Sequence, residues 1–285
     1  MQDIYEETKY IMNKYKIKAN KSLGQNFLVS QQVVDNIVGS SEITKEDLVI
    51  EIGPGLGTLT KELLERAGKV ICIELDKNMI KILEDRFSLY NNFEIIFNDV
   101  LKVNLDKIIK EEKEKNNLKK AKIVANLPYY ITTPIIMKLL EEKLDLESIT
   151  VMIQKEVADR LIAIPGEKNT GAITYAVYYY SVAEKILEVP KESFIPEPEV
   201  TSEVIKLNIR KNEIIDVKDK ELMFKIIKNA FMQRRKTLLN ALANAKIFKS
   251  KDEGKEILKK LGLDENVRAE KISLEKFAEM TNLIK

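Results

Sequence analysis

A glycine-rich segment is the first part of the chain whose residue types suit ligand binding. Residues 51–57 read Glu-Ile-Gly-Pro-Gly-Leu-Gly and begin inside the apolar run 48–52. Gly53 and Gly55 let the backbone pass close to a ligand and adopt positive φ angles. Their spacing differs from the Gly-x-Gly-x-x-Gly pattern of dinucleotide-binding loops, and no P-loop lysine follows, so a phosphate cradle is not expected. By itself the segment also suits an ordinary tight turn between a strand and a helix.

Two carboxylates follow the next two apolar segments. Glu74 comes 21 residues after Gly53, where a carboxylate can accept hydrogen bonds from both hydroxyls of a ribose. Asp99 follows the apolar run 93–97 and could accept a hydrogen bond from an adenine amino group. Taken singly, each also has a structural explanation, as a strand-end acid or a helix cap. Because three matched positions follow three successive apolar runs, they predict a nucleoside-type ligand at the carboxyl ends of strands.

The third motif whose residues could take part in a reaction is Asn126-Leu127-Pro128-Tyr129. The amide oxygen of Asn126 and the carbonyl of Leu127 can hold the two N–H groups of an adenine amine, so that its lone pair faces a methyl donor. Pro128 restricts the backbone that aims this carbonyl. Tyr129 offers a ring on which an extruded base can stack. The segment also suits a turn before a helix, since prolines are common there.

The elements that must position these residues alternate between strands and helices. Strands are expected at 48–52, 70–75, 93–97, from 122, 149–153, 185–189 and 203–209, and helices at 58–67, 77–87, 105–115, 134–142, 154–164, 174–183, 221–244, 251–262 and 273–283. Residues 194–198 contain two prolines and are expected to form an extended loop. This alternation predicts a parallel, three-layer α/β sheet, followed by a helical region.

The boundary between these regions is expected near residue 210. Residues 211–285 hold 18 Lys and Arg against 12 Asp and Glu, a net charge of +6, and the segment 225–251 has eight basic residues and no acid. An N-terminal arm, residues 1–30, carries five lysines and no acid between Lys9 and Lys21. The two basic stretches suggest an anionic partner such as nucleic acid, although basic residues also simply solvate helix faces.

Composition excludes several classes of site. The chain has no histidine, which excludes Ser-His-Asp triads, Cys-His pairs and histidine-ligated metals. Its single cysteine, Cys72, excludes an internal disulfide. No apolar run reaches the ~18 residues of a membrane span, and the first residues lack a secretion signal. We therefore expect a cytoplasmic protein without a metal or a membrane, and a monomer, because no dimerisation heptad is present.

At this point the motifs resemble a known family. Asn126-Leu127-Pro128-Tyr129 together with the Glu-x-Gly-x-Gly-x-Gly segment resembles the amino-adenine methyltransferases, and more specifically the bacterial small-subunit (16S) rRNA adenine dimethyltransferases, the KsgA family. The resemblance runs nearly end to end. It includes residues 21–28 (Lys-Ser-Leu-Gly-Gln-Asn-Phe-Leu), 154–160 (Gln-Lys-Glu-Val-Ala-Asp-Arg), 194–202 (Phe-Ile-Pro-Glu-Pro-Glu-Val-Thr-Ser) and 231–237 (Phe-Met-Gln-Arg-Arg-Lys-Thr).

The resemblance implies a Rossmann-like class I methyltransferase domain, 1–210, that uses S-adenosylmethionine, and a small all-helical rRNA-binding domain, 211–285. Implied cofactor contacts are Asn26, Leu28, Gly53, Gly55, Glu74, Asp99 and Asn126. Phe194 would oppose Tyr129 across the target base. No role is implied for residues 154–160.

The implied reaction dimethylates two adjacent adenosines in a loop near the 3′ end of small-subunit rRNA, during ribosome biogenesis. An unpaired loop base costs less to extrude than a paired one. The partner would be the small ribosomal subunit, with Arg234, Arg235 and Lys236 on rRNA phosphates.

Three alternatives remain. Large-subunit rRNA adenine methyltransferases of the macrolide-resistance type usually have Asn-Ile-Pro-Tyr and a shorter C-terminal domain, so Leu127 and the helical tail favour the small-subunit enzyme. DNA adenine methyltransferases often carry Asp/Asn-Pro-Pro-Tyr and a separate target-recognition domain, which is not evident here. An RNA-binding ribosome assembly factor with secondary catalysis is the third alternative. The intact Glu74, Asp99 and Asn126 favour retained catalysis and are compatible with an assembly role as well.

Overall fold

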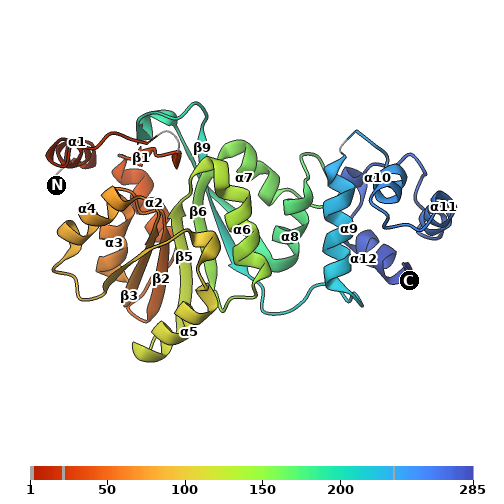
Figure 1. Cartoon of the computed structure of the whole chain (residues 1–285), viewed down its shortest axis with the longest axis horizontal. Helices are drawn as coiled ribbons and strands as arrows, with labels where there is room; N and C mark the ends of the chain where they lie inside the picture. Colours follow the sequence, from red (N-terminus) through yellow and green to blue (C-terminus); the bar gives the residue numbers. More distant parts are fainter. Residues whose placement is uncertain (1–2, 21–22, 234, 285) are drawn as a thin grey trace. The chain divides into compact units, whose positions relative to one another are not determined.

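Parallel strands carry the glycine-rich segment and the residues that follow it. The computed structural model describes residues 3–20, 23–233 and 235–284, and within them seven strands form one sheet (Figure 1). They are β2 (Asp47–Ile52), β3 (Lys69–Glu74), β4 (Phe93–Phe97), β5 (Lys120–Asn126), β6 (Ser148–Gln154), β7 (Ser181–Val189) and β9 (Ser202–Ile209). Their order is β4–β3–β2–β5–β6–β9–β7, with β2 to β6 parallel and β9 antiparallel to β6. The predicted α/β fold is confirmed, with β9 as an antiparallel addition.

Helices connect the parallel strands and cover both faces of the sheet. They are α3 (Thr58–Arg66), α4 (Lys77–Phe87), α5 (Leu105–Lys115) and α6 (Thr132–Glu141). Every residue of β2 and β3 is buried, as expected for strands with helices on both sides. The chain moves from β2 toward β4 and then returns to β5 and β6, so right-handed crossovers place α3 and α4 on one face and α5 and α6 on the other. The order therefore reverses between β2 and β5, which is where such sheets bind ligands.

The N-terminal segment contains more regular structure than expected. Helix α1 (Ile4–Lys14) lies within the region predicted as a basic arm, and α2 (Gln31–Ser40) follows it. Helix α2 buries Val33, Val34, Ile37 and Val38, whose spacing follows one helical face. Helix α1 is held by Glu7, whose carboxylate pairs with Arg86 of α4 at 2.5 Å. Much of this segment is therefore packed on the α/β body and is not a free arm.

A short second sheet joins the N-terminal segment to a distant loop. Strand β1 (Phe27–Leu28) pairs antiparallel with β8 (Phe194–Ile195), so that Leu28 lies opposite Phe194. Beside this pair, the Val29 N–H donates to the Ser193 carbonyl at 2.8 Å. The loop expected at 194–198 thus begins with a strand, because residues 27–29 supply hydrogen-bond partners for its backbone.

Contacts divide the chain into two units. One comprises residues 1–158 and 183–209, and the other residues 159–182 and 210–285. Close to the expected boundary, the chain passes from the first unit to the second between residues 209 and 210. In addition, residues 159–182, with α8 (Ala172–Tyr180), group with the helical part. The reason is packing, since the buried Tyr175 hydroxyl donates to the Ile272 carbonyl at 2.6 Å and its ring meets Phe277 edge-on.

The helical unit ends the chain. Besides α8 it contains α9 (Lys220–Met232), α10 (Leu238–Asn244), α11 (Lys251–Lys260) and α12 (Leu274–Leu283). The single helix predicted over 221–244 is wrong. A turn in which the Lys236 N–H donates to the Gln233 carbonyl separates α9 from α10, and the Thr237 hydroxyl caps α10 by accepting from the Asn240 N–H.

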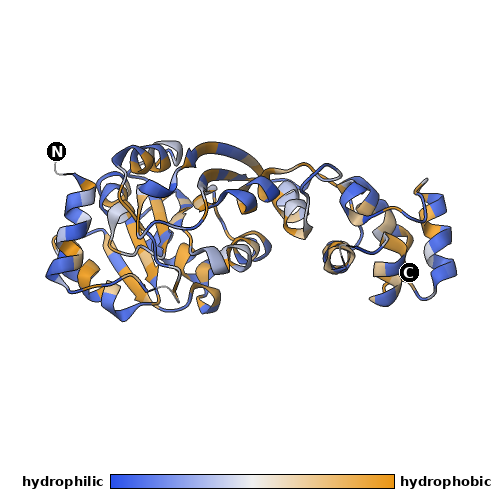
Figure 2. Cartoon of the chain, turned by 90° about the horizontal axis from the view of Figure 1, so that it is seen from above, coloured by the Kyte–Doolittle hydropathy of each residue, from blue (hydrophilic) through white to orange (hydrophobic). Residues whose placement is uncertain are grey.

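Figure 2 shows apolar colouring along the strands and alternating apolar and polar bands on the helices, as amphipathic packing requires. Among the described residues, no helix is both long and apolar enough to cross a membrane.

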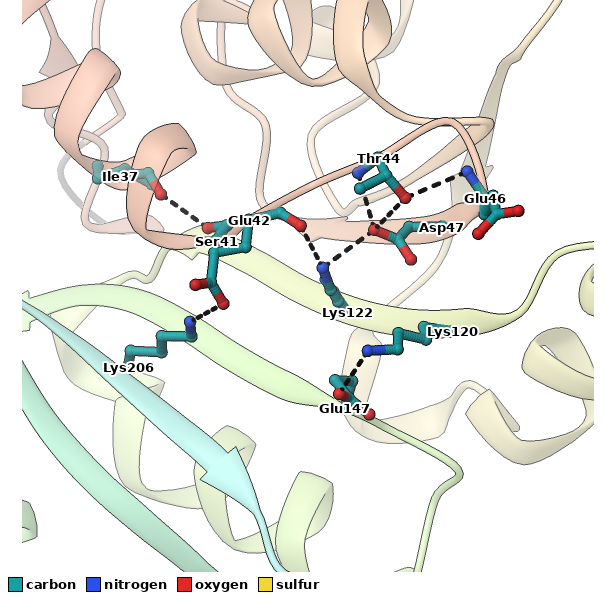
Figure 3. Close-up of polar contacts among 10 residues, drawn as sticks. All are labelled: Ile37, Ser41, Glu42, Thr44, Glu46, Asp47, Lys120, Lys122, Glu147 and Lys206. Atoms are coloured by element: carbon teal, nitrogen blue, oxygen red, sulfur yellow. Dashed lines mark hydrogen bonds and ion pairs between the residues drawn. The ribbon is translucent and has the colours of Figure 1, made fainter.

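A polar network closes the amino-terminal edge of the sheet. The buried Lys122 ammonium of β5 pairs with the buried Asp47 carboxylate of β2 at 3.0 Å and donates to the Glu42 carbonyl at 2.6 Å (Figure 3). Asp47 also accepts from the Thr44 N–H, and the Glu42 carboxylate pairs with Lys206 of β9. The network fixes the turn between α2 and β2 at the edge opposite the glycine-rich segment.

Candidate active site

A pocket opens at the carboxyl ends of the strands, where their order reverses. It is lined by residues 23–28, 51–56, 58–59, 73–75, 98–100, 126–131 and 135. All seven predicted cofactor contacts therefore line one pocket, together with Leu127, Pro128 and Tyr129.

The glycine-rich segment forms the floor of this pocket. Gly53 and Gly55 have φ angles of 66° and 57°, which side-chain-bearing residues rarely adopt. A Cβ atom on Gly53 would meet only Pro128 Cδ, at 3.9 Å, so the missing side chain leaves open space for a ligand. Gly57 is instead required for helix packing, because a Cβ there would lie 2.6 Å from the ring of Phe87 and would push α3 away from α4.

The Glu74 carboxylate lies beside this floor. Its Oε1 accepts from the N–H groups of Leu75 at 2.7 Å and Asp76 at 2.8 Å, and its Oε2 accepts from the Gly55 N–H at 3.4 Å. Burial raises the pKa of Glu74, while the backbone donors partly oppose this rise. The end of β3 and the glycine-rich segment are thus joined through one carboxylate.

Asp99 lies at the end of β4. Its Oδ1 accepts from the Leu101 N–H at 3.0 Å and caps the short 3₁₀ helix Val100–Lys102. The helix-cap explanation considered from the sequence therefore holds. Since Asp99 also lines the pocket, its second oxygen is suited to a ligand donor.

Asn126 at the end of β5 is oriented by the N-terminal loop. Its Nδ2 donates to the Asn26 carbonyl at 3.1 Å. The hydrogen bond assigns the amide so that Oδ1 is the atom left to accept from a substrate. Leu127 is buried and Pro128 follows it, with the Pro128 carbonyl accepting from the Thr132 hydroxyl at 3.1 Å.

Three aromatic residues, Tyr129, Tyr130 and Phe194, differ in their exposure and in whether they line the pocket. The Tyr129 hydroxyl is hydrogen-bonded to the Ser202 hydroxyl, which fixes the ring at the pocket wall, and burial raises the pKa of Tyr129. Tyr130 is 59% exposed at the rim. Phe194 is only 2% exposed and is not among the lining residues, because it packs into the core behind Leu28. The structure does not bring Phe194 to the pocket, and its contact with a target base stays a prediction.

Two residues that the sequence analysis quoted only within motifs, without assigning them a role, also line the pocket. Glu51, in the middle of an apolar strand, is completely buried, and burial raises its pKa to about 7, opposed by a 2.6 Å hydrogen bond from the Thr60 hydroxyl. The signal was a lone acid in an otherwise apolar run. Gln25, on the loop that lines the pocket, donates to Asp76 at 2.9 Å. No periodicity indicates such a long-range contact.

The predicted RNA contacts lie in the helical unit. Arg234 is outside the described residues, whereas Arg235 and Lys236 are exposed in the turn before α10. Five further exposed lysines lie in the basic segment 225–251, at positions 225, 228, 246, 249 and 251. Within the part of the chain that the structure describes, no group of three Cys, Asp or Glu residues is arranged to hold a metal ion.

Comparisons with known proteins agree with this geometry. Residues 16–285 match the family model for ribosomal RNA adenine dimethylase. The chain is 47% identical to the ribosomal RNA small subunit methyltransferase A of Clostridioides difficile over 280 residues, covering 98% of this chain and 96% of that protein. It is 48% identical to the protein of the same name from Alkaliphilus metalliredigens, covering 96% and 95% of the two chains.

Solved structures give a similar result. A dimethyladenosine transferase from Plasmodium falciparum has a TM-score of 0.73 at 27% identity, covering 89% of this chain and 95% of that one. The 23S rRNA methyltransferase ErmE has a TM-score of 0.66 at 21% identity, covering 91% and 99% of the chains, and shows the shared fold.

Proposed function

The chain belongs to the ribosomal RNA adenine dimethylase family, and on this premise we propose that it uses S-adenosylmethionine to dimethylate adenosines of small-subunit rRNA. The observation that carries the proposal is the pocket itself. There the open floor at Gly53, the carboxylates of Glu74 and Asp99 and the oriented amide of Asn126 converge. As a donor and acceptor set, these residues fit a nucleoside that carries an amino-acid chain.

Each side chain has a distinct task in this proposal. Glu74 holds the ribose hydroxyls, Asp99 the adenine amino group of the cofactor, and the floor at Gly53 the amino-acid part. Asn26 and Leu28 close the pocket from the N-terminal side. When bound, S-adenosylmethionine supplies an electrophilic methyl group on its sulfonium.

The target amine is positioned by the end of β5. Asn126 Oδ1 and the Leu127 carbonyl accept its two N–H groups, so that its lone pair is freed from the ring. Tyr129, held through Ser202, offers a stacking face. No strong base is needed, because the nitrogen becomes acidic only after alkylation. Positioning and electrostatics therefore supply most of the acceleration.

For the substrate we propose two adjacent adenosines in a loop near the 3′ end of small-subunit rRNA, modified in the cytoplasm. The exposed basic residues of the helical unit support an RNA partner, with Arg235 and Lys236 on phosphates. Because they contact the backbone and not base edges, they contribute to affinity and not to the choice of base.

The test is methyl transfer to defined substrates. The protein is incubated with methyl-labelled S-adenosylmethionine and with undermethylated small subunits, large subunits or duplex DNA, and the nucleosides are resolved after digestion. We expect label in dimethyladenosine from small subunits alone. Label from large subunits would instead support the resistance-type activity, and no label despite measured cofactor binding would support an assembly factor.

A further inference from the structure

The N-terminal loop 23–28 crosses the pocket between two strand ends. At the β3 end, the Gln25 side chain reaches Asp76. At the β5 end, the Asn26 carbonyl accepts from Asn126. Just before these two residues Gly24, at a φ of 61°, packs against Tyr130, whose ring would lie 3.2 Å from a Cβ atom at that position.

Both ends of the Gln25 amide are engaged. Its Nε2 donates to Asp76 Oδ2 at 2.9 Å, and its Oε1 accepts from the Asn20 N–H at 2.9 Å. The other oxygen of Asp76 accepts from the Asn78 N–H at 2.9 Å and caps α4, so the carboxylate cannot turn away without uncapping the helix. The side chain of Gln25 is therefore a bridge of defined polarity between the loop and the start of α4.

This bridge stands next to both halves of the site. On one side, the Asp76 N–H donates to Glu74 Oε1 at 2.8 Å, so Asp76 and Glu74 belong to the same hydrogen-bonded turn. On the other side, Gln25 is followed directly by Asn26, whose carbonyl orients Asn126. Displacing Gln25 would disturb the loop that covers the cofactor and the amide that receives the target amine.

We propose that Gln25 is a positioning residue that couples cofactor binding to the orientation of Asn126, through its hydrogen bond to Asp76. Gln25 lines the pocket and Asp76 does not, but both polar ends of the Gln25 side chain are engaged by Asp76 and Asn20, so Gln25 acts through Asp76 and not by contact with the reacting atoms. The inference rests on the proposed use of S-adenosylmethionine but not on the identity of the RNA.

The test exchanges the polarity of the bridge. In Gln25→Glu the introduced carboxylate faces Asp76, and in Asp76→Asn the acceptor for Gln25 is lost. Each single variant should bind S-adenosylmethionine about tenfold more weakly, the size expected for one hydrogen bond to a charged group. The double variant Gln25→Glu with Asp76→Asn restores a donor opposite an acceptor and keeps the α4 cap. Its dissociation constant should return to within about threefold of that of the unaltered chain.

Calorimetry on the full chain without RNA measures these constants, so failure of the proposed substrate cannot be confused with failure of this inference. Single-turnover methylation at saturating cofactor gives the second readout, and it should fall about tenfold in each single variant and recover in the double variant. Gln32→Glu, at an exposed position of α2, is the matched control and should bind as the unaltered chain does. The proposal is overturned if both single variants bind S-adenosylmethionine normally. It is also overturned if the double variant loses as much affinity as the two single variants lose together. A loss of folding in the single variants that the double variant does not repair would also overturn it.

Discussion

The buried carboxyl of Glu51 makes protein stability depend on pH in a way that one substitution should remove. Glu51 lies in β2 at the start of the glycine-rich segment, is only 2% exposed, and its charged form is disfavoured by burial. Thr60 donates to its Oε2 at 2.6 Å. Glu51→Gln keeps the shape and an acceptor for this hydroxyl but cannot ionise, so it imitates the protonated residue at every pH.

The magnitude follows from the pKa. In the folded chain the pKa of Glu51 is raised from 4.5 to about 7, so the folded state binds the proton more tightly than the unfolded state does. The stability from this group is fully present below about pH 4.5 and is lost as the pH rises to about 7. One pKa unit corresponds to about 1.4 kcal/mol, so the total loss is about 3 kcal/mol, of which about 2 kcal/mol falls between pH 5.5 and pH 8.

Urea unfolding of both proteins at a series of pH values provides the assay. The free energy of unfolding of Glu51→Gln should gain about 2 kcal/mol relative to that of the unaltered chain between pH 5.5 and pH 8. Glu84→Gln, at an exposed position of α4, should show no such trend. A difference between Glu51→Gln and the unaltered chain that is constant over this range would refute the reasoning, because it would mean that Glu51 keeps an ordinary pKa.

Three further predictions concern the site, the RNA contacts and the core. Asn126→Ala should lower the single-turnover methylation rate about 100-fold while binding of small subunits, measured by filter retention, is kept; normal methylation would show that the amine is held elsewhere. Lys236→Ala should reduce the slope of log affinity against log salt by about 0.7–0.9 without changing base preference, and an unchanged slope would remove Lys236 from the interface. Lys122→Met leaves the Asp47 carboxylate buried without its ammonium partner, so it should lower the unfolding free energy by about 3–5 kcal/mol in urea; a loss under 1 kcal/mol would indicate that water reaches this network.

The part of the pocket lined by Gly53, Glu74 and Asp99 was predictable because it follows from strand order. Gly53, Glu74 and Asp99 each come just after an apolar run, and parallel strands present their carboxyl ends at one edge. The resemblance read from the motifs is confirmed by the family match over residues 16–285. The alternation of strands and helices, without any knowledge of distant contacts, was therefore enough to predict that these residues lie together.

What was missed depends mostly on contacts between distant segments. The Asn26 carbonyl orients Asn126, which is 100 residues away, and Leu28 pairs with Phe194, yet neither contact leaves a periodic pattern in the sequence. Phe194 was expected beside the target base. In the structure it is buried, and its place is set by the pairing of its strand with residues 27–28. The break at residues 233–237 is a different case, since the cap signal of Thr237 was visible and was outweighed by the surrounding helix formers.

The pairing of β1 with β8 has a consequence for the order in which the protein is made. Residues 27–28 leave the ribosome early, but their strand partners, residues 194–195, are synthesised more than 160 residues later. Closing such a long loop slows folding, and a nascent chain that ends before β8 has no partner for β1. The α/β units from β2 to β6 can therefore assemble during synthesis, whereas the wall of the pocket built by the N-terminal loop is completed afterwards. Residues 27–28 are translated well before residues 194–195 but can pair with them only afterwards, so a chain truncated before residue 194 should retain much of its parallel sheet without a completed pocket.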